Sequence, residues 1–230
     1  MAASSTLTTN TKHVNSFIKI YKISVWLELI ISAITIIISL CYCWRKGQPR
    51  YLRGFPIYFI MSLLSDLLYE AFRPHSGIII WIFTMFEALF FSYFFFLIFE
   101  AKQLRVLITV MASAFLLLGL TFFVLLPRVH NMILATLLES FILVLPCTLY
   151  YREMLSRRQI IGLNKNPAFF IVTGIFFYFL IQFPVILFSV FYSYAHNQPL
   201  AYLVYSMNNF SQFISYLLFI KAMQCLVNRT

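Results

Sequence analysis

Acidic side chains are the residues of this sequence that could do chemistry. There are only seven Asp and Glu in 230 residues, and three of them, Asp66, Glu87 and Glu139, lie near the middle of long apolar stretches. A carboxyl group in such surroundings could bind a cation, exchange a proton or donate a hydrogen bond in its neutral form. Because a charge at the centre of a membrane helix costs about 2.5–3.5 kcal/mol, we expect these three carboxyls to face the interior of a helix bundle.

The composition requires a membrane environment. The chain is 62% hydrophobic and only 10% charged, whereas a soluble globular domain carries about 25% charged residues. Seventeen Lys and Arg contribute to a formal net charge of +10, but they lie between long apolar stretches, which places them at lipid headgroups. We therefore predict an integral membrane protein that is surrounded by the lipid bilayer and has no nucleic-acid partner.

Seven apolar stretches are long enough to cross a membrane, for which a helix needs about 20 residues. The sequence predicts an all-α, polytopic transmembrane bundle of seven helices at residues 24–44, 55–72, 78–99, 106–126, 129–151, 167–194 and 200–225. A tight turn at Pro127 separates the fourth and fifth stretches. If this turn were re-entrant, the number of spans would fall to six.

Three regions follow from this division. Residues 1–22 form a polar and basic N-terminal tail, 23–226 the transmembrane domain and 227–230 a short cytoplasmic tail. The N-terminal tail lacks the apolar core and cleavage site of a signal peptide. Its lysines are spaced among apolar residues, which is compatible with a short interfacial helix, and a flexible tail is the alternative.

Basic residues determine the predicted orientation, because Lys and Arg concentrate in cytoplasmic connections. One side of the membrane carries the larger set: Arg45, Lys46, Arg50, Arg53, Lys102, Arg105, Arg152, Arg157, Arg158, Lys165, Lys221 and Arg229. The other side carries Lys12, Lys19, Lys22, Arg73 and Arg128. We therefore place the N-terminus outside and the C-terminus in the cytoplasm.

All four cysteines lie toward the cytoplasmic side in this orientation: Cys41, Cys43, Cys147 and Cys225. The cytoplasm is reducing, so we expect no disulfide framework. Their spacing matches no zinc pattern, and we interpret them as core or acylated cysteines.

Polar residues recur at helical spacing in six of the seven predicted spans. The fourth span is the exception and is expected at the periphery. The stripes are Glu28, Ser32, Thr35 and Ser39; Ser62, Asp66 and Glu70; Thr84 and Glu87; Thr136 and Glu139; Gly174, Tyr178, Gln182 and Ser189; and Tyr205, Asn208, Gln212 and Ser215. Residues three or four apart share one helix face, so each stripe can point into the bundle.

The most polar members of these stripes fall at one depth, in the outer half of the membrane. This convergence predicts a ligand or cation cavity that opens to the outside and is bounded by Asp66, Glu70, Glu87, Glu139, Gln182, Asn208 and Gln212. For Ser, Thr, Asn and Gln, hydrogen bonding between helices is an alternative role. Glu87 and Glu139 have no basic residue at their depth, which favours a functional role for both.

The motifs of membrane enzymes are missing. There is no HExxH helix, no GxSxG elbow and no Gly-rich phosphate loop, and the four histidines fall in the tail or in outside connections. A retinal-type cofactor would need a Lys deep in the last helix, but Lys221 lies near the inner surface. We therefore expect no catalytic activity, no cofactor and no metal centre, although an oxygen-only metal site among the acids is an open alternative.

Two segments carry a resemblance to known proteins: Phe86-Glu87-Ala88-Leu89-Phe90-Phe91-Ser92-Tyr93-Phe94-Phe95, and Tyr205-Ser206-Met207-Asn208-Asn209 with its continuation Tyr216-Leu217-Leu218-Phe219-Ile220. Through them the chain resembles a group of small, largely uncharacterised bacterial seven-helix membrane proteins. The resemblance implies a stand-alone bundle in the bacterial cytoplasmic membrane, with a sensor-like or unassigned role. It singles out Glu87 as the matching position, and it implies no established activity.

Three functions remain compatible with these features. The first is a receptor-like or sensory bundle that binds a small molecule or cation and signals through a cytoplasmic or membrane partner protein. The second is a proton- or cation-coupled transporter that uses the same carboxyls. The third is a non-catalytic scaffold subunit, in which the polar stripes only hold the helices together.

Overall fold

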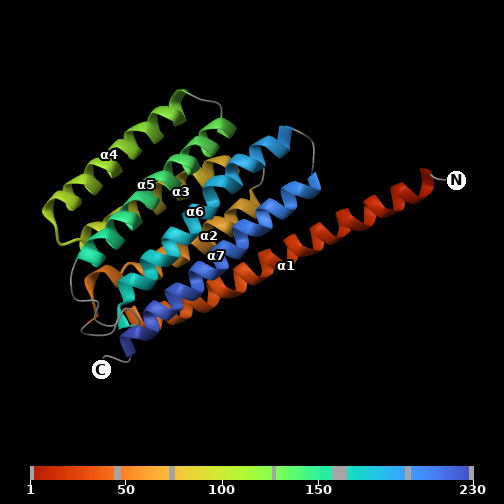
Figure 1. Ribbon diagram of the computed structural model, residues 1–230. Helices are drawn as coiled ribbons and strands as arrows, with labels where there is room; N and C mark the ends of the chain where they lie inside the picture. The colour runs from red at the N-terminus through yellow and green to blue at the C-terminus, as the bar shows by residue number, and fades with distance from the viewer. Residues whose placement is uncertain are drawn as a thin grey trace.

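The chain folds into a bundle of long helices (Figure 1). The computed structural model describes residues 3–43, 48–72, 76–125, 128–156, 165–194 and 198–227. These residues form seven α-helices and one short 3-10 helix, and none of them is in a strand: α1 (Ala3–Cys43), η1 (Arg50–Leu52), α2 (Phe55–Ala71), α3 (Ser76–Ile98), α4 (Lys102–Leu125), α5 (Arg128–Ser156), α6 (Pro167–Tyr194) and α7 (Gln198–Val227). The predicted all-α fold is confirmed.

Within the described ranges, five helices are long and apolar enough to cross a membrane. They include the stretches Ser16–Cys43, Gly77–Ile98, Lys102–Leu125, Ile133–Ser156 and Pro167–Phe188. The protein is therefore a multi-pass membrane protein. Helix α2 has only 17 residues, and α7 carries Asn208, Asn209 and Gln212 along one stretch. That these two helices also span the membrane stays a prediction.

Helix α1 continues through the boundary that the sequence suggested between tail and first span. It has 41 residues, which at 1.5 Å per residue is about twice the roughly 30 Å thickness of the hydrocarbon core. Residues 3–43 contain neither Pro nor Gly, so nothing in the sequence interrupts the helix. Figure 1 shows its N-terminal part extending beyond the ends of the other helices.

Helices α4 and α5 are separate, because α4 ends at Leu125 and α5 begins at Arg128. Pro127, where the sequence predicted a tight turn, lies outside the described residues. Two other prolines, Pro146 and Pro184, lie inside α5 and α6, which continue through them. A proline has no backbone N–H, so the carbonyl four residues earlier loses its helical partner.

Six helices form a closed ring in the order α1, α7, α6, α5, α3, α2 and back to α1, since each packs against the next. Helix α4 lies outside this ring and packs against α3 and α5, and its buried residues are only Ile108, Phe115 and Gly119. The sequence expectation that the fourth helix is peripheral agrees with this arrangement.

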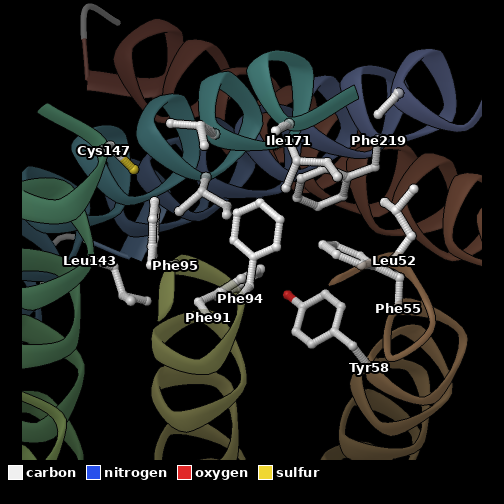
Figure 2. Close-up of a cluster of buried hydrophobic side chains, with 14 of the residues drawn as sticks. Leu52, Phe55, Tyr58, Phe91, Phe94, Phe95, Leu143, Cys147, Ile171 and Phe219 are labelled. Atoms are coloured by element: carbon white, nitrogen blue, oxygen red, sulfur yellow. The ribbon is translucent and has the colours of Figure 1, made fainter. Parts of the chain in front are cut away.

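Aromatic side chains fill the interior of the six-helix ring at one end. Phe55 of α2 makes edge-to-face contacts with Phe90 and Phe94 of α3, with ring centroids 5.2 and 5.6 Å apart. Figure 2 shows Phe55 and Phe94 packed between α2 and α3, with Phe219 of α7 beside them. Such edge-to-face pairs add about 0.5–1.5 kcal/mol each beyond the burial of their surface.

Helices α6 and α7 approach closely at Gly174. The Ser215 hydroxyl on α7 donates to the Gly174 carbonyl at 2.9 Å. A Cβ atom added at Gly174 would lie 2.9 Å from a ring carbon of Phe219 and 3.2 Å from the Ser215 carbonyl oxygen. Only glycine therefore permits this contact without a shift of one helix.

Candidate functional site

The ring of six helices encloses a cavity of about 440 Å³. Residues from α1, α2, α3, α5, α6 and α7 line it, and the described part of α4 contributes none. Its exposed lining residues are Leu67 and Tyr69 near the end of α2 and Tyr205 near the start of α7. The mouth is therefore at the end of the bundle from which α1 extends (Figure 1).

Six of the seven predicted site residues line this cavity: Asp66, Glu87, Glu139, Gln182, Asn208 and Gln212. They come from α2, α3, α5, α6 and α7. For the seventh, Glu70, the backbone belongs to α2 but the side chain lies outside the described part of the structure. The cavity thus brings together residues that are far apart in the sequence, and ligand binding by them stays a prediction.

A fourth carboxyl, that of Glu28 on α1, also lines the cavity. The sequence placed Glu28 at the head of a polar stripe but not in the site. The next members of that stripe, Ser32, Thr35 and Ser39, are buried but are not among the lining residues. Thr35 and Ser39 donate to carbonyls of their own helix. Only the outermost member of the stripe therefore reaches the cavity.

The four carboxyls are close enough to one another for electrostatic repulsion. Glu28 interacts with Asp66, Asp66 with Glu87, and Glu87 with Glu139. Among the described residues that line the cavity there is no Lys, Arg or His to balance them. The cavity therefore favours positive charge.

Glu87 and Glu139 are both almost completely buried, at 5% and 1% exposed, but their surroundings differ. The Tyr58 hydroxyl on α2 donates to Glu87 Oε1 at 2.5 Å. Glu139 Oε1 is buried and accepts no hydrogen bond from the described residues. Glu87 is thus held in place by a neighbouring helix, whereas Glu139 has an oxygen left for another partner.

Two further oxygens at the cavity share this property. Asp66 Oδ2 and Asn208 Oδ1 are buried and have no hydrogen-bond partner among the described residues. A buried polar group without a partner costs about 1–3 kcal/mol. Together with Glu139, they give the cavity three acceptor atoms that water or a ligand could satisfy.

Tyrosines hold the other polar groups of the cavity. Tyr216 OH lies 3.0 Å from the Ser62 hydroxyl and accepts from Gln212 Nε2 at 3.2 Å. The contact between Ser62 and Tyr216 joins α2 to α7, and together the two bonds fix the aromatic ring of Tyr216.

A second group joins α5 to α6. The Ser140 hydroxyl lies 3.3 Å from Gln182 Oε1, and Gln182 Nε2 donates to Tyr178 OH at 3.3 Å. Tyr178 lies within electrostatic range of Glu87, Glu139 and Glu28. The aromatic ring of Tyr178 is therefore positioned among three of the four carboxyls.

Sequence reasoning missed Tyr58 and Tyr216 as members of the site. The stripe of Ser62, Asp66 and Glu70 extends back by four residues to Tyr58, and Gln212 extends forward by four to Tyr216. The spacing was therefore visible, but a buried tyrosine in a sequence with fourteen of them carries little information.

No group of three His, Cys, Asp or Glu side chains within the described ranges is close enough to hold a metal ion. None of the four cysteines, which all lie within the described ranges, forms a disulfide. Cys43, Cys147 and Cys225 are buried, and Cys43 Sγ contacts Met223 Sδ at 3.1 Å.

No protein-family model matches this chain, and neither a curated protein nor a solved structure matches it.

Proposed function

We propose that this chain is a receptor-like or sensory membrane protein that binds a small molecule or cation in the cavity of the six-helix ring. One observation carries the proposal: Glu139 Oε1 is buried, has no hydrogen-bond partner among the described residues, and belongs to a cavity with four carboxyls and no described basic side chain. A scaffold would need no such cavity. Polar groups that merely hold helices together bond to one another, as Ser62 and Tyr216 do.

The size of the cavity supports this proposal. Small-molecule sites have volumes of about 300–1,000 Å³ and combine an apolar wall with a few polar groups. The cavity of about 440 Å³ has this composition, since residues such as Val25, Ile175 and Phe179 line it beside the carboxyls. A cationic ligand would be attracted by the carboxyls and would satisfy the unpartnered oxygens.

The basic residues favour an outward-facing cavity. Arg53 and Lys102 lie beside the helix ends opposite the mouth, and Arg105 donates to the Phe99 carbonyl at 2.7 Å in the same region. Lys and Arg accumulate on the cytoplasmic side of membrane proteins. We therefore propose seven spans, an outside N-terminus, a cytoplasmic C-terminus and a mouth that faces outward.

Signalling would use the helix packing around the ligand. Every helix of the ring contributes to the cavity wall, so a ligand that draws the carboxyls together favours one arrangement of the ring over another. The connections at the cytoplasmic end are too short for an output domain, and a partner protein would read the change.

Thermal unfolding of the protein in lipid nanodiscs tests the proposal. We expect NaCl, KCl, tetramethylammonium chloride or benzyltrimethylammonium chloride, compared at equal ionic strength, to raise the midpoint of the wild type in a saturable way. At the concentration that half-saturates the shift of the wild type, the same salt should shift Glu139→Gln far less. If none of the four shifts the wild type, the proposal is wrong.

A second candidate function is a proton- or cation-coupled transporter. The chain of electrostatic neighbours from Glu28 through Asp66 and Glu87 to Glu139 favours it, because proton pathways use such series of carboxyls. Uptake of tetramethylammonium, which has no neutral form that crosses lipid, into proteoliposomes but not into protein-free liposomes under an imposed pH gradient would favour transport. Binding without flux would favour the receptor.

A further inference from the structure

The cavity is unsuited to a bare divalent cation. Ca²⁺ takes six to eight oxygen ligands at about 2.3–2.6 Å, and Mg²⁺ requires octahedral geometry, so both need several oxygens that converge on one point. The carboxyls of the cavity interact pairwise along a chain of neighbours, as Glu28 does with Asp66 and Glu87 with Glu139. No three metal-binding side chains of the described residues converge on one point. The described side chains therefore form no site for a bare Ca²⁺ or Mg²⁺.

The walls of the cavity are rich in aromatic rings. The lining contains Tyr21, Tyr58, Tyr69, Phe83, Phe91, Tyr178, Phe179, Tyr205, Tyr216 and Phe219. The face of an aromatic ring attracts a cation, most strongly where water is excluded. Cages of such rings recognise quaternary ammonium groups, which carry charge but offer no N–H donor.

The rings have two locations in the cavity. Phe91, Phe179 and Phe219 also belong to the buried aromatic cluster that fills the ring of helices, and they form an apolar floor. Figure 2 shows Phe91 and Phe219 in this cluster, with the Tyr58 hydroxyl directed toward its centre. Tyr178 is instead placed among the carboxyls by its bond with Gln182.

These observations divide the cavity into a charged part and an apolar part. We infer that it takes an amphipathic organic ammonium ion, whose nitrogen lies between Glu139 and the Tyr178 ring and whose apolar group lies on the floor of Phe91, Phe179 and Phe219. This inference rests on the proposed function and names its ligand class. It differs from that function by excluding inorganic cations as the main ligand.

Binding of matched probes tests the ligand class. Isothermal titration calorimetry on the protein in nanodiscs should give the order benzyltrimethylammonium, tetramethylammonium, then Na⁺, with the first at least about 10-fold tighter than the second because its ring buries further apolar surface. Nanodiscs without protein correct for partition of the probe into lipid.

Two variants separate the role of the Tyr178 ring from that of its hydroxyl. Tyr178→Leu should weaken benzyltrimethylammonium binding roughly 10- to 30-fold, and Tyr178→Phe should keep most of the affinity because the ring remains. Tyr93→Leu is the control, because Tyr93 is exposed on α3 and does not line the cavity. If Tyr178→Leu does not fold, Phe83→Leu provides a second test of the aromatic wall.

The outcomes distinguish the two proposals. If Na⁺ or K⁺ binds in a manner that depends on Glu139 while neither ammonium ion binds, the ligand class is wrong and the proposed function stands. If neither Tyr178→Leu nor Phe83→Leu, correctly folded, changes the affinity for benzyltrimethylammonium, the aromatic recognition is also wrong. If no cation binds, the proposed function fails together with the inference.

Discussion

Replacement of Glu139 by Gln removes a carboxyl from the middle of α5 and preserves the size of the side chain. In the free protein this carboxyl is 1% exposed, and one of its oxygens has no hydrogen-bond partner within the described part of the chain. An unpartnered buried polar group costs about 1–3 kcal/mol, and a charge inside a membrane about 2.5–3.5 kcal/mol. Gln keeps a polar oxygen but removes the charge, so the replacement should leave the free energy of unfolding unchanged or raise it by about 1–2 kcal/mol.

Ligand binding should respond in the opposite direction. The trimethylammonium group has no N–H donor, so its contact with Glu139 is an ion pair. Loss of such a pair costs about 1.5–3 kcal/mol, so Glu139→Gln should weaken the binding of benzyltrimethylammonium about 10- to 150-fold. A variant that is as stable as the wild type but binds far more weakly is typical of a residue that is kept for function.

The assay measures both quantities on one preparation in nanodiscs: the unfolding midpoint without ligand, and the affinity for benzyltrimethylammonium by calorimetry. Glu153→Gln is the control, because Glu153 is on the same helix, close to its C-terminal end, and does not line the cavity. If Glu139→Gln lowers the midpoint substantially in the absence of ligand, the carboxyl has a structural partner and the reasoning is wrong. Unchanged affinity would refute it equally.

Three other predictions concern the hydrogen bond to Glu87, the packing of α6 on α7 and the orientation in the membrane. Tyr58→Phe removes the donor to Glu87 Oε1 and should destabilise the protein by about 1–3 kcal/mol in thermal unfolding, whereas Tyr93→Phe should not; equal effects would contradict the importance of this bond. Gly174→Ala should lower the free energy of unfolding by about 1–3 kcal/mol, because the added Cβ meets a backbone oxygen and a packed aromatic ring. Gly119→Ala should lower it less, because its Cβ meets only the flexible end of Met85. The reverse order would contradict the packing of α6 on α7. Lys102→Cys, in a background with the native cysteines replaced, should react with a membrane-impermeant thiol reagent only after the cytoplasmic face is opened, and labelling in intact cells would reverse the proposed orientation.

Much of the helical architecture could be predicted from the sequence, because the hydropathy and the helix breakers agree. The end of α2 at Ala71 and the start of α6 at Pro167 lie at or within one residue of the expected limits. The beginning of α1 was harder to predict. Polarity suggested a boundary near residue 22, but polarity alone does not end a helix, and no Pro or Gly interrupts residues 3–43.

The sequence allowed us to predict that three charged side chains face the cavity, and at what depth they lie. Asp66, Glu87 and Glu139 cannot face lipid at low cost, so their direction follows from the sequence. The order of the helices in the ring does not follow from it, because apolar stretches of similar length can be neighbours in many arrangements. Glu87 accepts a hydrogen bond from Tyr58, whereas one Glu139 oxygen accepts none from the residues that the structure describes, and this contrast depends on that order.

The occupancy of the cavity tests the central claim most directly. Crystals grown with 4-bromobenzyltrimethylammonium would place the probe through the anomalous signal of its bromine. We predict a bromine peak on the floor of Phe91, Phe179 and Phe219, with density for the ammonium group next to Glu139 Oε1. A cavity that holds only water at saturating probe, with bromine peaks confined to the lipid-facing surface, would contradict the account.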